Sequence, residues 1–256
     1  MSEWNPKLYM QFQNERTQPA IDLISRLDVS DPQTIIDLGC GPGNSTEMLR
    51  RRWPEAKITG LDSSSEMIEA AKTNYPQETW FLSDLATWKT DTPCDIVFSN
   101  AALHWLPGHD KLVTHLLDQV APGGALAFQI PTSSKSLLHP LILQTADEVQ
   151  WRTQMAAAKN VMTSESPAFY YDALQDKTSS LAIWETEYCH VMENHAAILE
   201  WISSTRLRPF LDCLDGEDQK ARFNALLAER LHAAYPTQKD GKVLFPFRRL
   251  FVIAYR

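Results

Sequence analysis

Short apolar runs alternate with helix-like segments between residues 33 and 130. In the helix-like segments apolar residues recur every three or four positions, whereas the short runs are nearly continuous, as in strands buried on both faces. The runs predict strands at Thr34–Leu38, Lys57–Leu61, Thr79–Leu82, Asp95–Ser99 and Leu126–Ile130, and the periodic segments predict helices at Asn44–Trp53, Ser64–Asn74 and Lys111–Val120. Such alternation is typical of an α/β fold, a parallel sheet covered by helices on both faces.

The pattern differs on either side of this region. Helical spacing of apolar residues extends over 1–30, over 136–160 and, as two or three helices, over 194–235. Leu181–Val191 alternates as a strand does, and Leu250–Tyr255 is an apolar run that predicts a buried strand. We therefore expect an N-terminal helical lid at 1–30, an α/β core at 31–131, and a helical cap at 132–256 whose two late strands complete the core sheet.

Composition and charge exclude several classes of protein. The 256 residues have a formal net charge of −8, which argues against nucleic-acid binding because that usually needs a basic face. No apolar run approaches the roughly 18 residues of a membrane span, and we expect no membrane partner. The four cysteines are too far apart for a metal knuckle or a redox pair, so we expect reduced thiols and no metal. The first residues lack the pattern of a signal peptide, and we expect a cytoplasmic protein.

A glycine-rich turn follows the first predicted strand. Gly39, Gly41 and Gly43 alternate with other residues, and the next helical pattern begins at once. Glycine permits positive φ and a close approach of the backbone, so a strand, glycine turn and helix in this order are typical of a nucleotide-like ligand. The dinucleotide fingerprint G-x-G-x-x-G fails because Asn44 replaces its third glycine, which disfavours a nicotinamide dehydrogenase. The Gly-Lys-Ser/Thr of a phosphate-binding loop is absent.

Further markers lie at the ends of later strands. Asp62 ends the second strand about 20 residues after the turn, where a carboxylate can accept hydrogen bonds from both ribose hydroxyls. Asp84 follows the third strand, where an acid can accept from the exocyclic amine of adenine. Gly123 and Gly124 form a turn that leads into the fifth strand. Each marker is weak alone, and their combination is specific.

Together these markers resemble the class I methyltransferases that use S-adenosylmethionine, over about residues 33–130. The resemblance implies a Rossmann-like, seven-stranded, mostly parallel sheet with a helical cap, S-adenosylmethionine as cofactor and S-adenosylhomocysteine as product. It implies ten cofactor-binding residues: Asp37, Gly39, Cys40, Gly41, Asp62, Ser63, Met67, Asp84, Leu85 and Asn100. The glycine turn would pass under the methionine part, Asp62 would bind the ribose diol, and Asp84 with Leu85 would recognise the adenine edge. Asn100 would offer its carbonyl to the methionine ammonium.

Segments outside the core resemble one family more closely. Residues 4–16, 100–107, 168–172, 207–209 and 247–251 are similar to the trans-aconitate 2-methyltransferases. The resemblance implies methyl transfer to one carboxylate of trans-aconitate, a small anionic substrate, giving its monomethyl ester. Planar polycarboxylates are best held by arginine. The candidate substrate-binding residues are Tyr170, Tyr171, His195, Arg206, Arg208, Arg248, Arg249, Trp4 and Tyr9.

The chemistry places few demands on the protein. A carboxylate has a pKa near 4 and is already a nucleophile at neutral pH, so no general base is required. Trp105 and His104 follow the fourth strand, where ligands meet open α/β sheets, and are expected to orient the reactants. Another small acid, a hydroxyl or an amine remains a possible acceptor, and a hydroxyl would favour His104 as base. A non-catalytic protein that binds S-adenosylmethionine is a further alternative.

Overall fold

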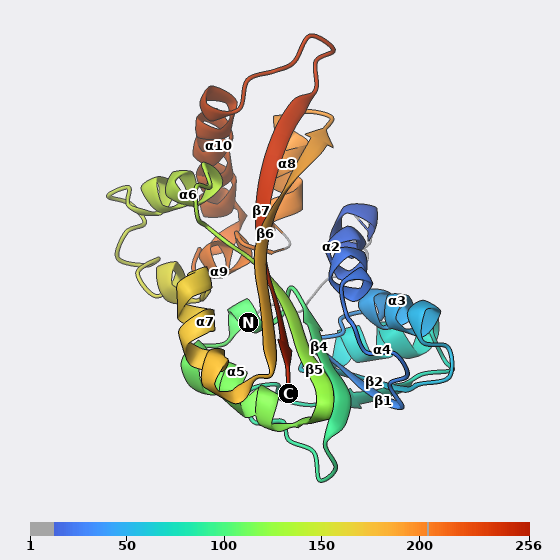
Figure 1. Cartoon of the computed structure of the whole chain (residues 1–256). Coiled ribbons are helices and arrows are strands. Elements are labelled where there is room, and N and C mark those ends of the chain that lie inside the picture. Colours follow the sequence, from blue (N-terminus) through green and yellow to red (C-terminus); the bar gives the residue numbers. More distant parts are fainter. Residues whose placement is uncertain (1–12, 204) are drawn as a thin grey trace. The chain divides into compact units, whose positions relative to one another are not determined.

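The computed structural model describes residues 13–203 and 205–256, so Trp4 and Tyr9 lie outside the described residues (Figure 1). The described chain divides into two compact units. We call residues 13–131, 163–186 and 249–256 the sheet unit, and residues 132–162 and 187–248 the helical unit.

Seven strands form one sheet in the order β3-β2-β1-β4-β5-β7-β6. Their bounds are β1 Thr34–Leu38, β2 Lys57–Asp62, β3 Thr79–Leu82, β4 Cys94–Asn100, β5 Val120–Pro131, β6 Ser180–Met192 and β7 Val243–Tyr255. β1 runs parallel to β2 and β4, β2 to β3, and β4 to β5, whereas β7 is antiparallel to β5. The predicted seven-stranded, mostly parallel sheet is confirmed. The strand order reverses between β1 and β4, and open α/β sheets bind ligands at the carboxyl ends of the strands beside such a reversal.

Helices cover both faces of the sheet unit. Their bounds are α2 Gln13–Ser25, α3 Asn44–Arg52, α4 Ser65–Asn74, α5 His109–Asp118 and α7 Pro167–Leu174, with short 3₁₀ turns η1 at Leu103–Trp105 and η3 at Gln175–Lys177. α2, α3 and α4 lie on one side of the strands, and α5 and α7 lie on the other (Figure 1). The loops that connect these strands to the helices that follow them therefore lie at one edge of the sheet, the edge that bears the glycine turn.

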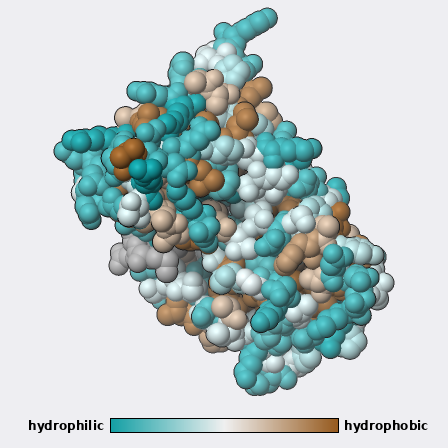
Figure 2. All heavy atoms as spheres, turned by 90° about the vertical axis from the view of Figure 1, so that its left-hand side faces the viewer, coloured by the Kyte–Doolittle hydropathy of each residue, from teal (hydrophilic) through white to brown (hydrophobic). Residues whose placement is uncertain are grey.

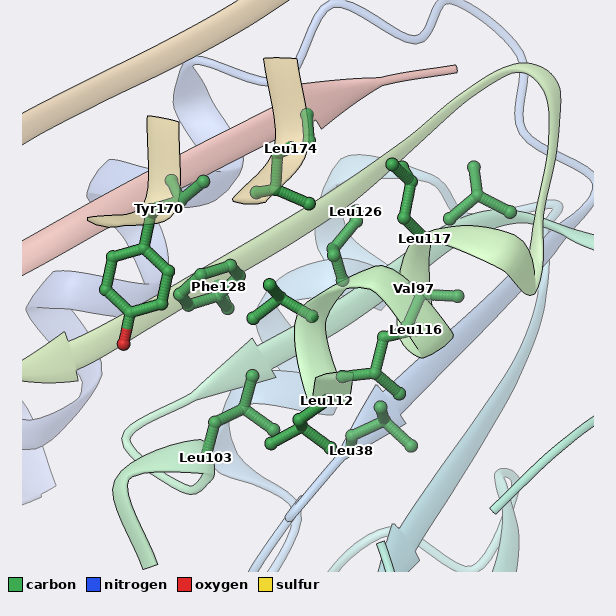
Figure 3. Packing of buried hydrophobic residues seen from close by; sticks show 14 of the residues in the cluster. Leu38, Val97, Leu103, Leu112, Leu116, Leu117, Leu126, Phe128, Tyr170 and Leu174 are labelled. Atoms are coloured by element: carbon green, nitrogen blue, oxygen red, sulfur yellow. The ribbon is translucent and has the colours of Figure 1, made fainter. Parts of the chain in front are cut away.

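The core on the α5–α7 side follows from alternation along the strands. Leu38, Val97 and Phe128 project from β1, β4 and β5 into one cluster with leucines of α5 (Figure 3). Full burial of each such side chain is worth about 1.5–3 kcal/mol. Tyr170 of α7 belongs to the same cluster, fully buried, with its ring edge-on to Phe128 at a centroid distance of 5.2 Å. Tyr170 was predicted to bind substrate, and in the structure it is part of this core.

The helical unit contains shorter helices than the sequence predicts. Its elements are α6 Leu138–Ala146, η2 Ala158–Asn160, α8 His195–Ser203, α9 Arg208–Leu211 and α10 Gly216–Ala234. The helix predicted over 136–160 is wrong beyond Ala146, where tight turns take over. Trp151 and Met155 recur at helical spacing because both are buried in these turns, and Trp151 packs edge-on against Phe223 of α10 at 5.1 Å.

Exposed residues of the protein are mainly polar on the face seen in Figure 2. Figure 2 shows a mostly hydrophilic face with scattered apolar residues. Within the described ranges, the structure contains no helix with both the length and the apolar character that crossing a membrane requires.

A buried ion pair stabilises the entrance to β3. Glu78 has a side chain only 1% exposed and makes a two-pronged contact with Arg50 of α3, at 2.7 Å and 2.8 Å. Arg50 also donates to the carbonyls of Pro54 and Ala56. We expect Glu78→Gln to lower the free energy of unfolding by about 2 kcal/mol, because it leaves the Arg50 charge without its carboxylate.

Urea denaturation followed by circular dichroism measures that loss. Glu69→Gln is the matched control, since Glu69 forms an exposed pair with Lys72 and should cost about 0.5 kcal/mol or less. Equal effects of the two substitutions would contradict a structural role for the Arg50–Glu78 pair.

Candidate functional site

The turn between β1 and α3 is fixed by its neighbours. The amides of Gly39 and Cys40 both donate to the Leu61 carbonyl of β2, at 2.7 Å and 3.0 Å. Gly39 has φ +71°, and a Cβ there would lie 2.1 Å from the Cβ of Ala102, which follows β4. Only glycine fits such a close approach in a left-handed conformation. The turn therefore lies at the carboxyl ends of β1, β2 and β4, where the strand order reverses.

Gly41 and Asp62 form the central contact of the site. The Gly41 amide donates to Asp62 Oδ2 and the Ser64 amide donates to Asp62 Oδ1, both at 2.9 Å. Burial raises the pKa of Asp62, and these amide hydrogen bonds oppose that rise. The Ser63 amide also interacts with this carboxylate, which offers about four acceptor positions, so acceptor capacity remains for a ligand. Gly41 has φ +55°, and a Cβ added there would meet nothing within 4 Å. The arrangement can hold a diol beside an open stretch of backbone.

Asp37 lies beneath the turn rather than on it. It is fully buried, and its Oδ2 accepts from the hydroxyls of Ser45 and Thr46 at 2.7 Å and 2.6 Å. Its Oδ1 has no hydrogen-bond partner among the described residues. Burial raises the pKa of Asp37 to about 6, against the effect of the two hydroxyls. The side chain braces the start of α3, at the cost of a destabilised carboxylate.

Asp37 makes the stability of the protein depend on pH. Because its pKa is higher in the folded than in the unfolded state, the stabilising contribution is complete below pH 3.8 and is lost as the pH rises past about 6. From pH 4 to pH 7 we expect a loss of about 2 kcal/mol from this group. Asp37→Asn keeps an acceptor for the hydroxyls and should remove this part of the pH dependence. Denaturant unfolding at several pH values measures it, and parallel curves for variant and wild type would contradict it.

The adenine side of the predicted site lies at the end of β3. The Ser83 amide donates to the Asp62 carbonyl at 2.9 Å, which places the two strand ends together. Asp84 is exposed and accepts from the Ala86 amide at 2.9 Å through Oδ1. Leu85 is buried, and its Cδ2 would lie 3.3 Å from a Cβ at Gly39.

The start of α4 borders the same region. Ser63 is exposed, Met67 is buried, and the Met67 amide donates to the hydroxyl of Ser64, which caps the helix. The predicted helix began at Ser64, and in the structure Ser64 is instead the capping residue before a helix that begins at Ser65.

Asn100 ends β4 and is held by a polar chain. Its Oδ1 accepts from Gln129 Nε2 at 2.8 Å, and Gln129 Oε1 accepts from Arg249 Nη1 at 3.2 Å. Ala101 follows with φ +54°, an uncommon conformation for a residue with a Cβ. Arg249 was predicted to bind substrate, and the structure places it against Gln129. Gln129 itself was missed, although a glutamine inside an apolar strand is a visible signal of a buried polar contact.

His104 and Trp105 occupy η1, directly after Ala101 and Ala102. His104 is buried and its ring lies 4.9 Å from that of Trp105, while its carbonyl accepts from the Thr163 amide at 2.8 Å. A residue that the sequence analysis missed, His109, donates through Nε2 to the Leu103 carbonyl at 3.0 Å and accepts the Tyr170 hydroxyl at Nδ1. Burial lowers the pKa of His109, which suits this neutral form. The buried pair fixes the turn that carries Trp105.

The predicted substrate residues differ in their surroundings. Tyr171 in the sheet unit is 52% exposed. In the helical unit, His195 Nε2 donates to the Tyr235 carbonyl at 2.7 Å, and Arg248 pairs with Glu187 at 3.0 Å. Arg208 lies 3.9 Å from Asp212. Arg206 is buried and is the one predicted arginine of this unit without a carboxylate within 4.0 Å among the described residues.

In the part of the chain that the structure describes, no three His, Cys, Asp or Glu side chains gather as a metal site requires.

Comparisons with known proteins point to methyltransferases. A family model described as a methyltransferase domain matches residues 35–124. The trans-aconitate 2-methyltransferase of Rhodopseudomonas palustris (strain BisA53) is 43% identical over 255 residues, covering 99% of both chains. The trans-aconitate 2-methyltransferase of Azoarcus sp. (strain BH72) is 41% identical over 256 residues and covers 100% of both chains.

Solved structures share the fold at low sequence identity. The YcgJ protein from Bacillus subtilis has a TM-score of 0.60 at 13% identity, covering 93% of this chain and 99% of that one. A coclaurine N-methyltransferase solved with S-adenosylhomocysteine has a TM-score of 0.55 at 15% identity, covering 93% of this chain and 72% of that one. These structures bear on the fold, and the full-length relatives bear on the family.

Proposed function

This chain belongs to the trans-aconitate 2-methyltransferase family, and we propose that it transfers the methyl group of S-adenosylmethionine to one carboxylate of trans-aconitate. The products are the monomethyl ester and S-adenosylhomocysteine. Family membership supports the substrate. The observation that carries the cofactor is the contact between the Gly41 amide and Asp62, with open space beside Gly41.

The residues at the strand ends fit the cofactor. A ribose diol needs acceptors, and the Asp62 carboxylate keeps acceptor capacity after binding the backbone amides around it. An adenine amine needs an acceptor, and Asp84 Oδ2 is on an exposed side chain. The cofactor supplies a sulfonium whose methyl carbon is electrophilic. We propose that Asp37, Gly39, Cys40, Ser63, Met67, Leu85 and Asn100 complete the binding residues.

The reaction depends on the alignment of methyl donor and acceptor and on the exclusion of water more than on proton transfer. A carboxylate oxygen of the substrate forms the new C–O bond while the S–CH₃ bond breaks and its electron pair stays on sulfur. No proton moves, because the attacking carboxylate is ionised at neutral pH. Holding donor and acceptor in line can supply up to about 7–11 kcal/mol of the barrier. We propose that Trp105 and His104, fixed by the buried His109–Tyr170 pair, shape the reaction side of η1 and exclude water.

The remaining assignments are proposals from residue type and charge. Arg206, Arg208 and Arg248, with His195, Tyr171 and Arg249, are candidates for the substrate, and so are Trp4 and Tyr9, which lie outside the described residues. Tyr170 is a positioning residue in this proposal, since its hydroxyl is bound to His109. From the net charge of −8 and the widely spaced cysteines we propose small-molecule partners, not nucleic acid, and a cytoplasmic location.

Methyl transfer from labelled S-adenosylmethionine tests the function. We expect label in an ester when trans-aconitate is supplied, with weaker or no transfer to monocarboxylates, hydroxyl compounds or amines. Transfer that requires a hydroxyl acceptor and disappears in His104→Ala would favour the alternative with His104 as base. Binding of S-adenosylmethionine without turnover on any acceptor would favour a non-catalytic protein.

Asp84→Ala should weaken S-adenosylmethionine binding about tenfold, because one hydrogen bond to a charged acceptor is lost at an exposed site. The Michaelis constant for trans-aconitate should not change. Isothermal calorimetry measures the affinity, and Asp91→Ala, another exposed acid before β4, is the matched control. Identical affinities in both variants and wild type would remove Asp84 from the site.

A further inference from the structure

Arg206 is a buried cation without a counter-charge in the helical unit. Arg206 is only 8% exposed, and burial lowers the pKa of its guanidinium to about 10. Among the described residues its one hydrogen bond is from Nη1 to His139 Nδ1, at 3.2 Å. A guanidinium has five N–H donors, so most of its donor capacity is unused. A charge removed from water at this cost usually has an ionic partner.

Two other arginines of the same unit are neutralised by carboxylates. Arg230 pairs with Glu148 and Arg248 pairs with Glu187. The helix that carries His139, α6, has no acidic residue in its first turn, and the positive end of its dipole lies there. The first turn of α6 thus offers no carboxylate to the Arg206 guanidinium, and these surroundings favour an incoming anion.

His139 orients the guanidinium. Its Nδ1 accepts from Arg206, which requires the neutral ring with the proton on Nε2. Burial and the adjacent Arg206 lower the pKa of His139, which keeps the ring neutral. The bond holds one edge of the guanidinium and leaves its other donors for a planar, two-oxygen partner.

We propose that Arg206, positioned by His139, binds a carboxylate of the substrate that is not methylated, and so selects polycarboxylates over monocarboxylates. The inference rests on the proposed function for the identity of the anion. Arg206 contacts the substrate in this proposal, and His139 acts through Arg206.

Arg206→Met is the first test, because methionine keeps an unbranched side chain without the charge. In the absence of ligand the variant should melt about 2–4 °C higher than wild type, since an uncompensated buried charge is removed. The rise in melting temperature caused by trans-aconitate in the presence of S-adenosylhomocysteine should vanish. The Michaelis constant for trans-aconitate should rise roughly 30-fold while that for S-adenosylmethionine is unchanged.

Arg230→Met is the matched control in the same unit. Because Arg230 has a carboxylate partner and also donates to the Thr145 hydroxyl, its loss should lower the melting temperature and leave the Michaelis constant for trans-aconitate unchanged. A lower melting temperature for Arg206→Met, with an unchanged Michaelis constant for trans-aconitate, would overturn the proposal and make Arg206 a structural residue.

His139 variants test the positioning role and do not depend on the Arg206 variant folding. His139→Leu removes the acceptor and should raise the Michaelis constant for trans-aconitate several-fold, with little change in kcat. His139→Asn places an oxygen near the position of Nδ1 and should restore the wild-type value. Equal Michaelis constants for wild type and His139→Leu would overturn the role of His139.

A ligand series separates this inference from the proposed function. The probes are trans-aconitate, fumarate and crotonate, which carry three, two and one carboxylates, and thermal shift reads their binding without turnover. Wild type should be stabilised by the first two more than by crotonate, and Arg206→Met should lose this preference. Absence of turnover with a preserved preference would overturn the function alone. Turnover in a wild type without any preference would overturn the inference alone.

Discussion

Gly41→Ala is expected to reduce the affinity for S-adenosylmethionine at least a hundredfold while lowering stability only slightly. Gly41 has φ +55°, which costs an alanine about 1–2 kcal/mol. Its added Cβ would meet no protein atom within 4 Å, so the folded protein accommodates the methyl group. The methyl group would instead stand in the open space beside Gly41, where we propose that the cofactor lies. The loss should thus fall on binding, at about 3 kcal/mol or more.

Gly123→Ala separates steric exclusion from backbone strain. Gly123 has φ +81°, and a Cβ there also meets nothing within 4 Å. It lies in the turn at the start of β5, away from the carboxyl ends of the strands. Both variants should therefore lose similar stability in thermal melts, and only Gly41→Ala should lose cofactor affinity by calorimetry. Gly39 is not a suitable probe, because its Cβ would collide with Ala102. Equal affinities of the two variants would place the cofactor elsewhere.

Local patterns predicted the sheet well because its strands are buried by contacts that repeat along the sequence. Thr34–Leu38 and Thr79–Leu82 match the structure, and the other parallel strands differ by a few residues at their ends, except β5, which begins at Val120. β7 begins at Val243, whereas the predicted strand began at Leu250. The first part of the strand was missed because Pro246 and two arginines interrupt its apolar pattern. The helix predicted past Ala146 failed because spacing of apolar residues reports burial, which turns can also provide.

Some residues of the candidate site could be predicted from local patterns, and others could not. The glycine turn, Asp62 and Asp84 follow directly from strand ends, so the sequence places them at one edge of the sheet. The bonds from Arg249 through Gln129 to Asn100, and from Arg206 to His139, join residues far apart in the chain. Residue type suggested an anion for all four candidate arginines, whereas burial and partners distinguish Arg206 from the rest. No spacing rule contains that information.

Asp62→Ala is expected to weaken S-adenosylmethionine binding several hundredfold. Two ribose hydroxyls lose a charged acceptor, each bond being worth about 1.5–3 kcal/mol. The amides of Gly41 and Ser64 also lose their acceptor, so the turn is no longer held in the binding conformation. Calorimetric titration of S-adenosylmethionine and S-adenosylhomocysteine measures the change, which should be similar for both because the ribose is common to them.

Asp62→Asn distinguishes the charge from the shape of the side chain. Asparagine keeps one acceptor oxygen, so Asp62→Asn should lose less affinity for S-adenosylmethionine than Asp62→Ala does. Because burial raises the pKa of Asp62, its ionised form destabilises the folded protein above the ordinary pKa range of an aspartate. The asparagine variant should therefore be at least as stable as wild type at pH 7 and yet bind more weakly. A carboxylate kept at a cost to folding, and needed for binding, is what a ribose-binding residue requires; wild-type affinity in the alanine variant would refute that role.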